Sequence, residues 1–62
     1  MGYNRNEYIM EVIDNSKKIY DLSLELKKSK EVRDINELLM LIRSLSKDNT
    51  KKIEDLLNLK RV

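Results

Sequence analysis

Pairs of carboxylates are the groups in this sequence whose spacing could support chemistry. Glu7 and Glu11 are four residues apart, as are Asp21 and Glu25, so each pair would share one face of a helix. Carboxylate oxygens in this arrangement are hard ligands of the kind that bind Ca²⁺ or Mg²⁺. No glycine turn or histidine accompanies either pair, and such isolated pairs are typical of surface charge. We therefore expect no metal site.

The side chains that usually carry catalysis are missing. The chain has no histidine and no cysteine, which removes the usual general base, the thiol nucleophile and the usual zinc ligands. The only glycine is Gly2, so a phosphate-binding glycine loop is not possible. We expect a protein that is not an enzyme, has no cofactor and binds no small molecule.

Charge is abundant but nearly balanced, with 13 Lys and Arg against 11 Asp and Glu. Opposite signs recur four residues apart, as at Asp14 and Lys18, which is typical of solvated helix faces. No apolar run approaches the ~20 residues of a membrane span, and the N-terminus has no apolar signal region. We expect a cytoplasmic protein without membrane contact.

Hydrophobic spacing predicts an all-α fold in one domain that covers residues 1–62. A first helix over residues 5–28 would be capped by Asn4 and Glu7. Its seam, in which spacings of four and three alternate, comprises Tyr8, Val12, Asn15, Ile19, Leu22 and Leu26. A polar turn over residues 29–33 should follow.

Two capping signals predict two further helices. Asp34 would cap a helix over residues 35–45, and Ser46 would cap another over residues 47–60. The middle helix is apolar on almost every side, so we expect it to be buried. The last helix should bury Ile53, Leu56, Leu57 and Leu59. Because no Gly or Pro marks the break at Ser46, the alternative is one fused helix and a two-helix hairpin.

Two segments of the chain nearly repeat. Residues 14–22 read DNSKKIYDL and residues 48–56 read DNTKKIEDL, so they differ only at Ser16/Thr50 and Tyr20/Glu54. In the three-helix arrangement the first segment lies inside a helix and the second begins one. We interpret the match as a coincidence within a restricted set of residue types.

Unequal helix lengths suggest a partner. A short middle helix folded against residues 5–28 would leave the N-terminal part of the first seam uncovered, and its own apolar surface exceeds what one neighbour can bury. A polar seam residue such as Asn15 can specify partner number. We therefore expect a homodimer, since two-fold dimers are the commonest oligomers.

These features favour a small helical protein-interaction module that acts as a regulator, adaptor or inhibitor through an apolar helix face and self-association. Its partner would be another protein, itself, or both. Tyrosine is enriched at interface hot spots. The expected contact residues are Tyr8, Ile9, Val12, Ile13 and Tyr20.

The alternative is a small dimeric regulator that binds nucleic acid through basic patches. The candidate phosphate contacts are Lys27, Lys28, Lys30, Arg33, Lys51 and Lys52. Two hairpins forming a four-helix bundle would resemble in outline the small plasmid RNA-binding regulators of that architecture, although no sequence motif of that family is present. The interleaved charges favour protein binding over nucleic-acid binding.

Overall fold

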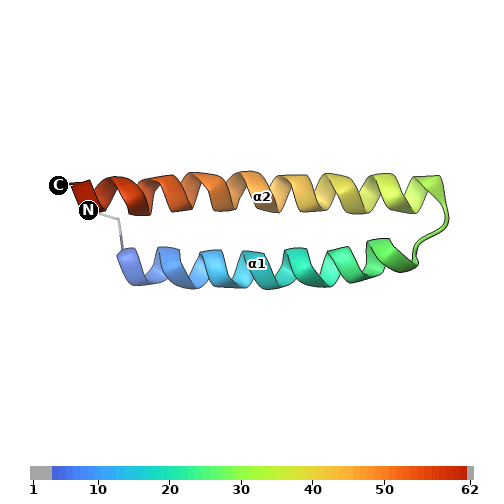
Figure 1. Ribbon diagram of the computed structural model, residues 1–62, viewed down its shortest axis with the longest axis horizontal. Helices are drawn as coiled ribbons and strands as arrows, with labels where there is room; N and C mark the ends of the chain where they lie inside the picture. Colours follow the sequence, from blue (N-terminus) through green and yellow to red (C-terminus); the bar gives the residue numbers. More distant parts are fainter. Residues whose placement is uncertain (1–3, 62) are drawn as a thin grey trace.

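Two antiparallel helices joined by a short turn make up the structure (Figure 1). The computed structural model describes the backbone of residues 4–61 and the side chains of residues 4–58. Helix α1 covers Arg5–Lys28 and helix α2 covers Val32–Arg61. The all-α class is confirmed, because the described residues contain helix and turn but no strand.

Helix α1 begins and ends with side-chain hydrogen bonds. The backbone N–H of Glu7 donates to Asn4 Oδ1 at 3.1 Å, which satisfies one of the free donors of the first turn. At the other end the backbone N–H of Ser29 donates to the carbonyls of Glu25 and Leu26. The hydroxyl of Ser29 also donates to the Glu25 carbonyl, at 2.9 Å. The predicted range of 5–28 for the first helix, with its Asn4 cap, is confirmed.

Helix α2 runs without a break through both predicted capping sites. The three-helix arrangement is therefore wrong, and the fused two-helix alternative describes the structure. Asp34 lies within the first turn of α2, and Ser46 lies inside the helix, where its carbonyl accepts from Thr50 Oγ1 at 2.9 Å. Both near-repeat segments consequently lie inside helices. The capping signal at Ser46 does not end the helix, because α2 packs against α1 on both sides of this residue.

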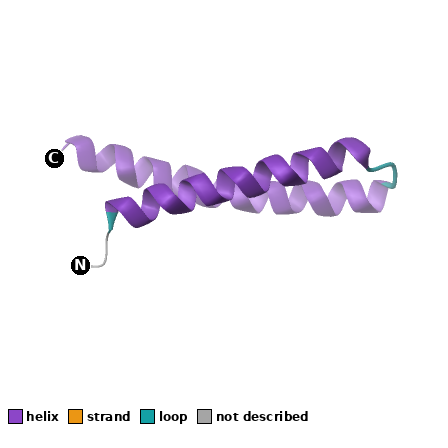
Figure 2. Ribbon diagram, turned by 90° about the horizontal axis from the view of Figure 1, so that it is seen from below, coloured by secondary structure: helices purple, strands orange, loops and turns teal. Residues whose placement is uncertain are grey.

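The contact between the helices follows one heptad seam on each helix. On α1 the seam comprises Tyr8, Val12, Asn15, Ile19, Leu22, Leu26 and Ser29, all partly or largely buried. On α2 it comprises Ile35, Leu38, Ile42, Leu45, Asn49, Lys52 and Leu56, with the same degree of burial. Alternating spacings of four and three keep each seam turned towards the other helix. The two helices cross near the middle of the hairpin (Figure 2).

The hairpin is a rod without a sealed core. Its principal dimensions are 47 × 18 × 14 Å and its radius of gyration is 14.4 Å. A compact domain of this length would have a radius of gyration of roughly 11 Å. Among the described residues no hydrophobic side chain is fully shielded from water, and the most shielded residues are Asn15 and Asn49, each 9% exposed.

Two expectations about burial are wrong. The fused helix α2 is long enough to reach Tyr8 and Val12, so unequal helix lengths leave no part of the first seam uncovered. Because α2 has only one neighbour, the apolar residues on its other sides remain exposed. These are Leu39, Met40 and Leu41 in the predicted middle helix, and Ile53 and Leu57 further along. The side chain of Leu59 lies outside the described residues.

Candidate interaction surface

Polar side chains occupy the middle of the seam. Asn15 Nδ2 donates to Asp48 Oδ2 at 2.8 Å, and Asn49 Nδ2 donates to Ser16 Oγ at 3.2 Å. Both bonds join α1 to α2. The second asparagine is less well satisfied, since its buried Oδ1 accepts no hydrogen bond. An unsatisfied buried acceptor costs about 1–3 kcal/mol, so the central seam fixes the register of the helices at some cost in stability.

Lys52 links this polar centre to the termini end of the hairpin. Its Nζ lies 2.8 Å from Asp48 Oδ2 and 3.1 Å from Glu11 Oε1 on the opposite helix. The same ammonium lies 5.7 Å from the ring centroid of Tyr8, within the range of a cation–π contact. The Lys52 side chain is only 16% exposed. Lys52 therefore fills a seam position through its aliphatic stem while its charge is paired.

This network shifts two pKa values in opposite directions. Hydrogen bonds from Lys52 and then Asn15 hold the pKa of Asp48 below its ordinary value of 3.8. Hydrogen bonds to Asp48 and then Glu11 hold the pKa of Lys52 above its ordinary value of 10.5. Both shifts favour the charged forms, so the pair stays ionised across the neutral pH range.

Carboxylates gather on one side of the hairpin. Glu11 meets Lys52 on this side, and Asn15 meets Asp48 there. Every acidic residue of α1, and every acidic residue of α2 except Glu54, occupies a heptad position that turns this way. We name this surface the carboxylate face; its acidic members are Glu7, Glu11, Asp14, Asp21, Glu25, Asp34, Glu37, Asp48 and Asp55.

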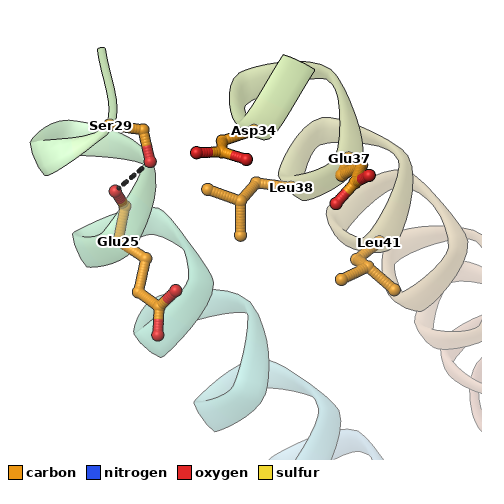
Figure 3. Close-up of a pocket in the computed structure, with 6 residues that line it drawn as sticks. All are labelled: Glu25, Ser29, Asp34, Glu37, Leu38 and Leu41. Carbon is orange, nitrogen blue, oxygen red and sulfur yellow. Dashed lines mark hydrogen bonds between the residues drawn. The ribbon is translucent and has the colours of Figure 1, made fainter. Parts of the chain in front are cut away.

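A shallow depression of about 230 Å³ lies on the carboxylate face near the turn (Figure 3). Glu25 of α1 borders it on one side, and Asp34 and Glu37 of α2 border it on the other. Leu38 and Leu41 complete the α2 side. Within the described residues no group of acidic side chains is arranged to hold a metal ion, and this depression is no exception.

Among the side chains of residues 4–58, none on the opposite side of the hairpin is a carboxylate. Ser16 and Asn49 meet on this side. We name it the acid-free face; it comprises Asn6, Ile9, Ile13, Ser16, Tyr20, Ser23 and Lys27 of α1, and Asn36, Leu39, Arg43, Ser46, Thr50, Ile53 and Leu57 of α2. Its apolar members are all exposed. Hydroxyl side chains occupy its middle. Four apolar side chains lie towards the termini (Ile9, Ile13, Ile53 and Leu57), and Leu39 lies towards the turn.

The predicted contact residues fall into two groups. Tyr8 and Val12 lie in the seam against α2. Ile9, Ile13 and Tyr20 lie on the acid-free face, where they are exposed.

Helix α2 contributes further apolar residues to this face that the sequence interpretation did not include: Leu39, Ile53 and Leu57. The signal that would have found them is the α2 heptad, followed through Ser46. Asn49 and Lys52 at its central steps concealed that heptad.

The predicted nucleic-acid contacts are also divided. Lys27, Lys28, Lys30 and Arg33 are all exposed around the turn, but α1 places the first two on opposite faces of the hairpin. Lys51 is exposed on α2, whereas the charge of Lys52 is paired within the seam.

Arg43 and Lys47 precede Lys51 at intervals of four residues, so they form an exposed row on α2. Sequence interpretation did not add Arg43 to Lys47 and Lys51, because it assigned Arg43 and Lys47 to different helices.

Comparisons with known proteins give no further identification. Neither the family models, the curated proteins nor the solved structures include a match to this chain. A search of the described helices finds none with the length and apolarity that a membrane span requires.

Proposed function

We propose that this protein is a non-enzymatic helical interaction module that binds a protein surface through its acid-free face. The observation that supports the proposal is that six exposed apolar side chains share the side of the hairpin on which no described residue is acidic. Acidic residues lie on the carboxylate face, whereas Ile9, Ile13 and Leu39 are exposed on a face without any. Large exposed apolar side chains that gather on one side of a small protein are typical of an interaction site.

Tyr20 strengthens the proposal. It lies exposed on the acid-free face, two helical turns along α1 from Ile13. Tyrosine offers a large rigid contact area at a low cost in conformational entropy, and it is frequent among hot-spot residues. The module would act as a regulator, adaptor or inhibitor, and its expected cytoplasmic location stays a prediction.

The first test compares matched variants on the two faces. Ile13→Asp places a carboxylate on the acid-free face, and Leu41→Asp makes the same change on the opposite side, where the replaced residue is similarly exposed (58% against 53%). Affinity capture from cell extract with the intact chain should recover proteins that bind the wild type and Leu41→Asp but not Ile13→Asp. Equal recovery by all three proteins would contradict the proposal.

Nucleic-acid binding is the second candidate function, and the row Arg43, Lys47 and Lys51 favours it. These residues border a depression of about 390 Å³ on α2, and Glu54 is the acidic residue beside them. Because signs are mixed elsewhere, we expect affinity for random duplex DNA weaker than about 100 µM at physiological salt. A micromolar affinity that falls steeply with salt and is lost in Lys47→Glu would favour this candidate over protein binding.

A further inference from the structure

We propose that a second copy of this chain covers the acid-free face, so that two hairpins pack face to face as a four-helix bundle. This inference rests on the proposed function and identifies the bound protein as a second copy. Its starting point is that the apolar seam residues of the hairpin are only partly buried. Seam residues such as Ile19, Ile35 and Ile42 are only partly buried, because each helix has a single neighbour. A helix pair laid over this face would shield them.

The size of the face suits a dimer. The hairpin is 47 Å long and 18 Å wide across its broad side. A rectangle of these sides has an area of roughly 850 Å², close to the ~800 Å² that each partner contributes to a standard protein–protein interface. A single added helix about 10 Å in diameter would cover little more than half of that width.

The strip of the acid-free face next to the seam is uncharged, which favours a partner whose contact surface is also uncharged. Next to the seam the acid-free face presents Ile9, Ser16 and Ser23 on α1, and none of them is charged. On α2 the corresponding residues are Leu39, Ser46 and Ile53. A second copy can therefore pack against this strip without desolvating a charge, which is the costly event in helix packing.

Charges occur only towards the edges of the face, where Lys27 and Arg43 lie. A carboxylate-rich partner could pair with these two residues but would meet an uncharged centre. Self-association leaves both cations at the rim in water, where like charges are screened by salt. Salt dependence therefore distinguishes the two occupants: an acidic partner is released by salt, whereas a dimer of this kind is not.

The test is sedimentation equilibrium of the intact chain from about 1 µM to 1 mM, with helicity and thermal midpoint recorded on the same samples. We expect a dimer whose thermal midpoint rises with concentration, as linked folding and assembly require. Between 0.05 and 1 M NaCl the dimer should not weaken. Ile13→Asp should raise the dissociation constant at least about 10-fold, since it removes a large apolar side chain from the contact surface of each copy and adds a carboxylate at its edge. Leu41→Asp should change it by less than about threefold.

Two results would overturn the inference. One is a wild-type monomer at 1 mM with a thermal midpoint independent of concentration. The other is a dimer that survives Ile13→Asp but dissociates in Leu41→Asp, since this would place the contact on the carboxylate face. The wild-type measurements decide the first case even where Ile13→Asp fails to fold. A monomer that still captures a different protein through Ile13 would support the proposed function and contradict only the proposal that the partner is a second copy.

Discussion

The two near-repeat segments, residues 14–22 and 48–56, lie in opposite helices and contact one another at the centre of the seam. Equivalent residues of the two segments nevertheless occupy different positions relative to the seam. Asn15 and Asn49 both occupy the seam, but the next seam residue is Ile19 in the first segment and Lys52 in the second. The second segment is thus rotated about its helix axis relative to the first.

This rotation has a consequence for surface chemistry. Ile53 is the counterpart of Ile19, and instead of packing in the seam it lies exposed on the acid-free face. Lys52 is the counterpart of Lys18, and it moves from the surface into the seam. Helix context, rather than local sequence, therefore decides which residues of such a segment are available to a partner.

The largest difference should appear when the equivalent aspartates are removed. Asp14 pairs with Lys18 at 3.2 Å, and both side chains are well exposed. Asp48 pairs with Lys52 and also accepts from the shielded amide of Asn15. Asp48→Ala leaves that amide unpaired, which costs about 1–3 kcal/mol, whereas an exposed pair such as Asp14–Lys18 contributes about 0.3–0.5 kcal/mol.

Urea unfolding of Asp48→Ala and Asp14→Ala at one protein concentration measures this difference. Equal losses in the free energy of unfolding would show that the second segment is no better integrated than the first.

A smaller effect of opposite sign is expected at the asparagines. Asn49→Leu removes an acceptor that has no hydrogen bond and adds apolar surface to the seam, at the loss of one long bond, 3.2 Å, to the exposed residue Ser16; the net effect should be a stabilisation of about 1 kcal/mol. Asn15→Leu removes a bond to Asp48 and should not stabilise it. Thermal unfolding of both variants is the measurement, and stabilisation by Asn15→Leu alone would contradict this assignment of roles.

The smallest effect concerns pH. Because the folded pKa of Asp48 is lowered, its contribution to stability is complete above 3.8 and is lost as the pH falls through the folded pKa. The raised pKa of Lys52 gives the opposite limb, with a contribution that is complete below 10.5 and lost as the pH rises through the folded pKa. Thermal midpoints between pH 2 and 7 should fall less steeply for Asp48→Asn than for the wild type, with Asp14→Asn as the matched control. Identical slopes for wild type and Asp48→Asn would contradict the network.

Sequence reasoning found the parts of the fold that local rules control. The Asn4 cap and the regular seam from Tyr8 to Leu26 were sufficient to define α1. It failed at Ser46. The capping signal there is local, whereas the packing against α1 that keeps α2 continuous involves residues distant in the sequence. Asn49 and Lys52 do not look like seam residues until their partners on α1 are known. Half of the acid-free face was missed for that reason, since Leu39, Ile53 and Leu57 align only when α2 is one helix.

Coverage of the acid-free face is measured most directly by the reactivity of single thiols, because the chain has no cysteine of its own. Ser23→Cys would report on the acid-free face, and Ser44→Cys, which replaces another exposed serine, on the carboxylate face. If a second copy covers the acid-free face, the alkylation rate of the thiol in Ser23→Cys should fall about 10-fold or more from 1 µM to 1 mM protein, while the rate in Ser44→Cys stays constant. Alkylation rates in both variants that do not change with concentration would contradict the account.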